Sequence, residues 1–508
     1  MAAPEPDIYD IVIIGSGLGG LLCGAILSRE GYRVCILEKN RQYGGCLQSF
    51  SREKALFDSG VHYVGSLAAG QTLHQVFRYA GIMQDLPAEQ MDAEVFDRIV
   101  FLEDGREYDL AQGYENFIQK LAEAFPGEKE AIENYSRHLQ EVCSRFPLYH
   151  LQSGGSLGEK MPVLEDTVSG KLSSFTANRR LQEVLAGNNL LYAGREGITP
   201  FYVHALVLNS FISSSWKIRD GGSQITRLLV KQIRAQKGEL YNHCKVVSLE
   251  EDAGKIKQAH LEDGRVVKGR TFISNLHPRR TLALTKSSLL RPAYRKRIEA
   301  LPDTISSFCV YAVLKPGVLR YEKHNYYLHA REGVWKAIDC DPDRWPQTCF
   351  VYFTAASGNS GCADAITLMT YMPFSWVEQW SETFNTDAVP GDRGDSYAAF
   401  KQEKEKQLIA LVEQHFPGLS SAIQSVYSSS PLSYRDYIGT SDGSLYGVAK
   451  DARDPVGGFI AAQTRIPNLY LTGQNLLLHG LMGVAMSALQ TCGHFTDLEK
   501  LLEKIRHA

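Results

Sequence analysis

The sequence has no basic leader segment, and its start has no uncharged run of bilayer length. Near the start, the uncharged residues 11–27 fall just short of the roughly 20 residues that span a bilayer. The segment before it, MAAPEPDIYD, contains acids but no Lys or Arg, and SREGYRV follows without a small-residue cleavage site. These absences argue against a secretory signal and against a membrane anchor.

An excess of charge of either sign is also absent. The chain of 508 residues has 54 Lys and Arg against 57 Asp and Glu, a formal net charge of −3. Such a balance gives no general attraction to nucleic acid or to anionic lipid. The length and a hydrophobic content of 44% instead predict two or three globular domains with ample core.

The ten cysteines form no C-x-x-C motif and no zinc-type spacing with histidine. No metal cluster and no nucleophile elbow are found, so we predict no metal site. Free thiols in a reducing cytoplasm are expected. We interpret the sequon Asn134-Tyr135-Ser136 as unused, and Arg393-Gly394-Asp395 as a chance motif in a polar loop.

What the sequence does contain is a nucleotide-binding pattern near its start, DIVIIGSGLGG. Residues 10–14 are typical of a buried parallel strand, and a G-x-G-x-x-G motif begins at Gly15. Residues 21–29 then predict a helix, and RVCILEK predicts a second strand. Together these segments predict a βαβ dinucleotide-binding unit.

Each glycine of that motif has a physical role. Gly15 makes the tight turn, Gly17 lets the backbone approach a pyrophosphate, and Gly20 lets helix and strand pack closely. The helix N-terminus offers free N–H groups to the phosphates. Glu38, at the end of the second strand, is placed to accept hydrogen bonds from a ribose.

A second glycine pair, Gly44-Gly45, follows in NRQYGGCLQSF. A loop here would run back past the diphosphate, as in many flavin enzymes, although a plain turn explains the pair equally simply. No second G-x-G-x-x-G follows a strand, so we predict no separate nicotinamide-binding Rossmann domain.

The remaining elements are predicted from periodicity and turn residues. Residues 57–65 predict a strand and turn, and 71–145 a mainly helical region. The other expected elements are a helix at 224–236, a strand at 240–251, a hairpin at Asp263-Gly264 whose second strand ends at Asn275, strands within 305–374, a helix at 398–416, a strand at 469–472 and a helix beginning near Met482 or Gly483.

Four stretches together resemble one family, the FAD-dependent phytoene desaturases, carotene isomerases and all-trans-retinol 13,14-reductases (retinol saturases). They are GSGLGG with Glu38 and Gly44-Gly45, the glycine–helix–hairpin block ending ISNLHP, SSSPLSYRDYIGTSDGSLYG, and LYLTGQNLLLHGLMGVAMSA. The third most separates this family from amine oxidases, although Ser433 stands where threonine is expected.

The resemblance implies an α/β fold with a Rossmann-like FAD-binding domain of the glutathione-reductase and amine-oxidase type. A mixed α+β substrate domain would be discontinuous. We expect the FAD-binding domain at 1–70, 217–290 and 456–508, and the substrate domain at 71–216 and 291–455.

The resemblance also implies site residues beyond the first motif. Val246 would offer its backbone to the adenine, and Gly473 would lie beside the diphosphate and ribityl chain. A helix beginning at Met482, Gly483 and Val484 would face the N1 and O2 edge of the flavin and stabilise the reduced ring. An ordinary core valine and an apolar core helix are the alternatives.

His62 and Tyr446 are the candidate catalytic side chains. The family often has a histidine at the first position, and His62 would face the flavin pocket; a structural histidine is the simpler interpretation. For Tyr446, a pocket wall is the simpler interpretation than an acid. The flavin itself would carry the chemistry.

The implied activity is oxidoreduction at carbon–carbon double bonds of a lipophilic polyene, by saturation, desaturation or isomerisation. NAD(P)H is a candidate external reductant. An amine-oxidase-like flavoenzyme is one alternative, and a non-enzymatic prenyl or lipid carrier, like the GDP-dissociation inhibitors, is another. The sequence leaves the oligomeric state open, and the missing leader suggests a bacterial relative.

Residues 181–216 are apolar and rich in aromatic residues. Because a polyene is nearly insoluble in water, we expect part of this segment to line a tunnel or to form a patch that contacts a membrane peripherally. A buried helical core is the alternative.

Overall fold

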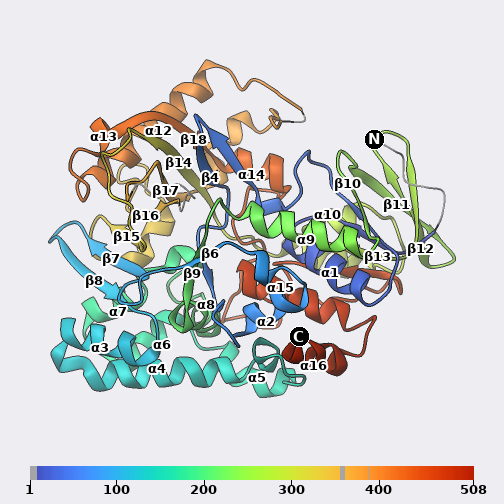
Figure 1. The fold of residues 1–508 in the computed structure, drawn as a ribbon, viewed down its shortest axis with the longest axis horizontal. Helices are drawn as coiled ribbons and strands as arrows, with labels where there is room; N and C mark the ends of the chain where they lie inside the picture. The colour runs from blue at the N-terminus through green and yellow to red at the C-terminus, as the bar shows by residue number, and fades with distance from the viewer. Residues whose placement is uncertain (1–7, 355–360, 388) are drawn as a thin grey trace.

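The computed structural model describes residues 8–354, 361–387 and 389–508. Two seven-stranded sheets dominate it and lie at the right and the left of Figure 1. The strands of the first sheet come from the beginning, the middle and the end of the chain, and those of the second from the segments between. The exact domain boundaries stay a prediction.

The first sheet has a parallel centre, in which both faces of the strands are buried. Its order is β10 (Glu239–Tyr241), β2 (Val34–Leu37), β1 (Tyr9–Ile14), β13 (Val266–Ser274) and β19 (Leu469–Leu471). Ile11 and Ile13 of β1 pack into one hydrophobic core, whereas Val12 and Ile14 pack into another. This explains why the strand is an unbroken apolar run rather than an alternating one.

Three helices cover one face of this sheet. Helix α1 (Leu18–Arg29) packs against α9 (Ser223–Ala235) and α15 (Gly480–Cys492). Both α1 and α15 begin a few residues earlier than predicted, because glycines in the first turn are tolerated where the helix is packed. None of the helices in the described ranges is long and apolar enough to cross a bilayer.

The second sheet is mostly antiparallel and comes from the middle of the chain. Its order is β18 (Ile423–Ser429), β14 (Ser306–Leu314), β17 (Ala365–Met372), β16 (Thr348–Phe353), β15 (Asn325–His329), β7 (Asp97–Phe101) and β8 (Arg106–Leu110). The long helix α12 (Asp395–Glu413) packs on three of these strands, close to the predicted range. No disulfide bond joins any of the ten cysteines within the described part of the chain.

Two secondary-structure predictions need correction. Residues 71–145 are mainly helical as predicted, with α2 (Thr72–Tyr79), α3 (Tyr114–Ala124) and α4 (Lys129–Ser144), but β6 (Ala88–Gln90), β7 and β8 lie between α2 and α3. Strand β7 pairs with β8 across a tight turn at Asp104-Gly105, a local hairpin that the helical interpretation missed, and with β15, more than 200 residues away.

The segment 240–251 is likewise not a single strand. It divides into β10 and β11 (Val246–Asp252), and the two strands have different neighbours. His243 between them has φ +53°, and the Cys244 amide donates to the Glu38 carbonyl at 2.7 Å. This turn ends one strand beside β2 and starts the next beside β12 (Lys255–Leu261).

The remaining elements are shorter. They are β3 (Ser49–Arg52), β4 (Ala55–Asp58), β5 (Val64–Gly65), β9 (Ser215–Ile218), α5 (Leu157–Leu164), α6 (Val168–Phe175), α7 (Arg179–Leu185), α8 (Phe201–Ser213), α10 (Pro278–Ala283), α11 (Pro292–Ala300), α13 (Leu419–Ala422), α14 (Pro431–Ile438) and α16 (Leu498–His507).

Candidate functional site

The carboxyl ends of the parallel strands meet at one edge of the first sheet, and candidate residues follow them there. Gly15 follows β1, Glu38 follows β2, and Gly473 comes shortly after β19. Asn275 follows β13. In open parallel sheets this edge is where ligands bind.

The turn between β1 and α1 is built as the glycine motif requires. Gly15 has φ +93°, and its amide donates to the Leu37 carbonyl at 2.8 Å. A Cβ on Gly20 would lie 2.1 Å from the Gly15 carbonyl oxygen. The close approach of helix and strand therefore excludes any side chain at Gly20, and the N-terminus of α1 faces the sheet edge.

The second glycine pair crosses directly over the first motif. Gly44 forms a parallel bridge with Gly17, and its amide donates to the Ser16 carbonyl at 3.0 Å. Gly44 and Gly45 have φ +115° and +57°, and a Cβ on Gly45 would lie 3.1 Å from Cα of Gly17. The pair is therefore a tertiary contact of the glycine turn rather than an isolated turn.

Glu38 is buried and organises the same turn. It accepts hydrogen bonds from the Ser16 amide at 3.0 Å, the Ser16 hydroxyl at 2.6 Å and the Asn40 amide at 2.8 Å. A carboxylate has about four lone-pair sites. These three bonds fix the orientation of the carboxylate and leave room for one further donor, such as a ribose hydroxyl.

Asn275 at this edge was not among the predicted site residues. Cβ atoms built on Gly17, Gly19 and Gly473 would lie 2.8, 2.6 and 2.7 Å from its side-chain amide atoms. Its side chain therefore occupies the centre of the ring of glycines. The available signal was a polar residue directly after a buried strand, TFISN.

These residues line one cavity, the nucleotide cavity, with an empty volume of about 1650 Å³ including its open mouth. The predicted residues among its lining are Gly15, Gly17, Glu38, Gly44, Gly45, His62, Val246, Tyr446, Gly473 and Val484. Within the described part of the chain, no group of three or more His, Cys, Asp or Glu could hold a metal ion.

Three predicted residues lie elsewhere. Gly20 is packed beneath the turn, as described above. Met482 and Gly483 line a neighbouring cavity instead. A Cβ on Gly483 would lie 2.3 Å from the Leu478 carbonyl oxygen, so this glycine lets the preceding loop fold against α15.

The neighbouring cavity, the apolar chamber, shares Gly60, Val61, His62, Met369, Tyr446, Gly480 and Leu481 with the nucleotide cavity. Much of its remaining wall is aliphatic or aromatic. The other lining residues are Tyr63, Val64, Gly65, Leu73, Tyr149, Leu190, Leu191, Leu206, Val207, Ser210, Phe211, Tyr327, Phe350, Leu478, His479, Met482 and Gly483.

For the segment 181–216 we predicted either a tunnel lining or a membrane-facing patch. Six of its residues, between Leu190 and Phe211, line the apolar chamber, as a tunnel would require. The same segment has no large hydrophobic side chain exposed on the surface. The expected membrane-facing patch is therefore absent from it, because helix α8 is enclosed by α3, α4, α5 and α6.

His62 lies at the junction of the two cavities, in the loop between β4 and β5. Its ring packs on Phe350 and Tyr352 at centroid distances of 5.4 and 5.1 Å. Burial, and then the charge of Lys217, lower the pKa of His62 to about 4, and its Nδ1 atom has no hydrogen-bond partner. The imidazole is therefore neutral at pH 7.

Tyr446 forms the opposite part of this junction. Its hydroxyl donates to the Leu190 carbonyl at 2.8 Å, and its ring lies 4.2 Å from that of His479. Burial raises the pKa of Tyr446 well above its usual value. With its proton already donated to the backbone, the residue is suited to be a wall rather than an acid.

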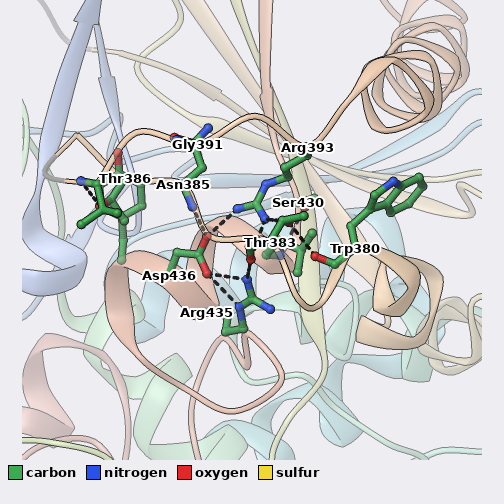
Figure 2. Close-up of polar contacts among 12 residues, drawn as sticks. Trp380, Thr383, Asn385, Thr386, Gly391, Arg393, Ser430, Arg435 and Asp436 are labelled. Carbon is green, nitrogen blue, oxygen red and sulfur yellow. Dashed lines mark hydrogen bonds and ion pairs between the residues drawn. The ribbon is translucent and has the colours of Figure 1, made fainter.

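Figure 2 shows a buried ionic cluster in the segment that most distinguishes the predicted family. Asp436 of α14 accepts from Arg393 at 2.5 Å, from Nε of Arg435 at 2.8 Å and from the Asn385 amide at 2.9 Å. The Arg393 side chain is only 5% exposed. The Arg-Gly-Asp motif lies, as predicted, in an exposed polar loop that leads into α12, but the side chain of Arg393 is committed to this cluster.

The cluster fixes α14 against the nucleotide cavity. The carbonyls of Asp436 and Tyr437 accept hydrogen bonds from Lys39 at 2.7 Å and from the Asn40 side chain at 3.0 Å. Lys39 and Asn40 directly follow Glu38. The family-specific segment therefore closes one side of the site that the glycine motif opens.

The chain is similar to known proteins of one group. Residues 13–80 match the model of the NAD(P)-binding Rossmann-like domain. The all-trans-retinol 13,14-reductase of Rattus norvegicus is 28% identical over 99% of this chain and 89% of its own length. The chloroplastic prolycopene isomerase of Arabidopsis thaliana is 24% identical over 98% and 84%, and the phytoene desaturase of Cercospora nicotianae 23% over 62% and 52%. The resemblance predicted from the sequence is therefore confirmed.

Solved structures share the fold at low sequence identity. An oxidoreductase from Methanosarcina mazei has a TM-score of 0.62 at 14% identity, covering 95% of this chain and 99% of its own. Putrescine oxidase bound to putrescine has 0.63 at 11%, covering 97% and 99%. A Rab GDI from Plasmodium falciparum has 0.52 at 10%, covering 97% and 99%. The fold class is confirmed, and the same fold is shared by an oxidoreductase, an amine oxidase and a Rab GDI.

Proposed function

We propose that this protein is an FAD-dependent oxidoreductase that acts on a carbon–carbon double bond of a lipophilic polyene. The observation that carries the proposal is the junction between the two cavities. A nucleotide cavity lined by glycine backbone opens into an apolar chamber, and His62 and Tyr446 line both. A cofactor with a dinucleotide end and a flat reactive end suits the first cavity, and a polyene suits the second.

Specific residues would hold each part of the cofactor. Gly15, Gly17 and Gly44-Gly45, with the N-terminus of α1, would take the diphosphate. Glu38 would accept a hydroxyl of the ribose. Val246 would meet the adenine through its backbone.

The flavin end would lie toward the chamber. Gly473 would flank the ribityl chain, and Asn275 could donate to it or to the diphosphate. The first turn of α15, with Met482, Gly483 and Val484, would meet the ring and favour its reduced, anionic form. A bound flavin supplies transfer of a hydride to or from a carbon of the substrate.

The chain itself would contribute binding and the exclusion of water. Contact with the apolar wall of the chamber would remove a polyene from water, which favours binding by about 25 cal/mol per Å² of apolar surface buried. The bound polyene would also displace water from the chamber, so that water would not compete at the reacting carbons. We propose saturation as the direction, because the retinol reductases are among the most similar relatives; NAD(P)H is a candidate source of electrons.

A non-enzymatic carrier is the second candidate, since a Rab GDI shares the fold. Colour distinguishes the two: the enzyme should purify yellow and release flavin on heating, whereas a carrier would stay colourless and resist reconstitution.

The decisive experiment reduces the bound flavin anaerobically and measures its reoxidation by a panel of retinoids, carotenoids and quinones, and in parallel mixes the oxidised flavin anaerobically with amines. Reoxidation by a retinoid or carotenoid supports the proposal, whereas reduction of the oxidised flavin by amines, without reoxidation by any polyene, would make the protein an amine-oxidase-like enzyme. A cytoplasmic location is part of the proposal and is tested by cell fractionation.

A further inference from the structure

A buried carboxyl group lies next to the apolar chamber. Asp97, the first residue of β7, is fully buried. One oxygen, Oδ2, accepts from the Tyr63 hydroxyl at 2.8 Å, and the other, Oδ1, accepts from the Asn325 side chain at 3.0 Å. Asn188 approaches Oδ2 at 3.4 Å. All of these partners are neutral, so Asp97 is not half of a direct ion pair.

A chain of hydroxyl groups connects this carboxyl to the chamber. The Tyr63 hydroxyl lies 2.9 Å from the hydroxyl of Tyr327, and both tyrosines line the apolar chamber. Tyr63 stacks on Phe211 at 4.2 Å, and Tyr327 packs on Phe350 at 5.0 Å. The three oxygens of Asp97, Tyr63 and Tyr327 are thus joined by two short hydrogen bonds within an otherwise apolar wall.

This polar chain is costly to bury and has no evident structural need. An apolar wall would be satisfied by phenylalanine at both tyrosine positions, as it is at Phe211 and Phe350. Burying a carboxyl group among neutral partners costs several kcal/mol if it is charged, so such a group tends to keep its proton. Its retention at the cavity wall points to a role in the chemistry of the cavity.

Saturation of a carbon–carbon double bond needs a proton as well as a hydride. The proposed flavin would supply the hydride, but neither His62 nor Tyr446 is suited to supply the proton. His62 is neutral at pH 7, and the Tyr446 hydroxyl is committed to a backbone carbonyl. We propose that Tyr327 is the proton donor of the reaction and that Tyr63 and Asp97 resupply its proton, an inference that rests on the proposed function.

The step balances in atoms and electrons. A two-electron reductant would provide, through the bound flavin, the hydride for one new C–H bond. Tyr327 gives its proton to the other carbon as the π bond breaks. When Asp97 is protonated, the hydrogen bond between its Oδ2 atom and the Tyr63 hydroxyl runs from the carboxyl group to the tyrosine, so Tyr63 then passes its proton to Tyr327 and Asp97 passes its proton to Tyr63 across the 2.9 and 2.8 Å separations. Asp97 remains as a carboxylate and regains a proton from solvent before the next turnover.

The electrostatic surroundings suit this cycle. Burial raises the pKa of Asp97 to about 7, close to the pH at which a general acid is most effective. The groups that face Asp97 are Tyr63, Asn188 and Asn325, with Lys217 of β9 as the charged group that acts on it. Lys217 donates to the carbonyls of Glu322 and Phe353, and Glu89 and Glu322 in turn act on its charge.

The test measures the two halves of the reaction separately. In the holoprotein, Tyr327→Phe should leave the flavin content and the anaerobic reduction of the flavin unchanged. Its reoxidation by all-trans-retinol should slow by about 10²-fold or more, as for loss of a general acid. Tyr371→Phe is the matched control, because its fully buried hydroxyl donates to the Asn189 carbonyl and it lies outside the chamber.

Tyr63→Phe and Asp97→Asn test the resupply of the proton. For the wild type, reoxidation should slow as the pH rises through about 7, where Asp97 loses its proton. In Asp97→Asn the slowing should be present at every pH, without that transition. A merely structural role would lower the rate but would leave the transition in place.

A second readout needs no activity. Infrared spectra of the ligand-free chain should contain the band of a protonated carboxyl that titrates near neutral pH and is missing from Asp97→Asn. If retinol reoxidises the wild type and Tyr327→Phe equally, or if no such band titrates, the proton chain is wrong while the proposed function stands. If no polyene reoxidises the wild type, the proposed function fails and the inference fails with it.

Discussion

The two cavities are built in opposite ways. In the nucleotide cavity glycines form much of the wall at the sheet edge, where Gly15, Gly17, Gly44 and Gly473 present backbone, and Glu38 and Asn275 are among the polar residues there. The apolar chamber is lined mainly by residues with aliphatic or aromatic side chains. A phosphate is recognised by N–H groups that any residue carries, whereas a polyene is recognised by shape and apolar area.

The two cavities also differ in how the chain assembles them. Much of the nucleotide cavity comes from one segment, residues 14–62, in which each feature has a local spacing. The chamber takes its wall from loops, α8, β15, β16 and the start of α15, which lie far apart in the sequence. Binding in the nucleotide cavity should therefore depend on the absence of side chains at its glycines, and binding in the apolar chamber on the volume of individual side chains.

The largest expected effect is on FAD binding at the place where Gly44-Gly45 lies over Gly17. Gly17→Val should abolish FAD binding while the chain still folds in part, since even its Cβ would lie 2.8 Å from the Asn275 amide, in the space a pyrophosphate needs. The measurement is the flavin content per chain. Gly127→Ala is the control, because nothing lies within 4 Å of a Cβ there. Normal flavin content in the Gly17 variant would contradict the assignment of the cavity.

The next variant should affect the function of the apolar chamber without affecting that of the nucleotide cavity. Val207→Phe adds volume inside the apolar chamber, and so should leave the flavin content unchanged while slowing reoxidation by retinol about 10²-fold through misplacement of the substrate. Val318→Phe, at an exposed surface position, should change neither quantity. If the Val207 variant lost flavin instead, the two cavities would not be separable in function.

A smaller effect is expected at Glu38. Glu38→Ala should weaken FAD binding without eliminating it, by about 1.5–3 kcal/mol for the lost charge-assisted bond to a ribose. Because Glu38 also holds Ser16 and Asn40, the thermal stability of the flavin-free chain should fall as well. Titration of FAD against Glu38→Ala and the exposed control Glu299→Ala measures this, and equal dissociation constants would make Glu38 purely structural.

The smallest effect concerns the pH dependence of stability. The pKa of Asp97 is raised to about 7 in the folded chain, against about 3.9 when unfolded. The folded chain binds this proton more tightly, so stability should fall as the pH rises from about 4 to about 7.

In Asp97→Asn the decrease in Tm between about pH 4 and about pH 7 should be smaller by a few degrees, as measured by thermal unfolding at several pH values. The stability of this variant should still decrease with rising pH below pH 6, because burial also raises the pKa of Asp58 to about 6. An unchanged slope in the variant would mean that Asp97 is ionised throughout this range.

The sequence by itself determined the nucleotide end of this protein. The βαβ unit, the glycine spacing, Glu38 and the second glycine pair are properties of consecutive residues, because a turn, a helix start and a strand end each depend on local backbone geometry. Gly44-Gly45 could be assigned a place near the diphosphate for the same reason. The long amphipathic helices and the apolar segment 181–216 were also visible as periodicity and composition.

The apolar chamber and the residues that border it could be identified only from the tertiary structure. The strands β7 and β8 form a local hairpin within a region interpreted as mainly helical, and only the tertiary structure placed β7 beside distant β15. Asn275 reached the ring of glycines through the position of its strand in the sheet. Asp97, Tyr63 and Tyr327 carry no shared motif, and they meet because the adjacent strands β7 and β15 of the second sheet lie against the loop before β5. Contacts between distant segments depend on packing, and packing leaves no local mark in the sequence.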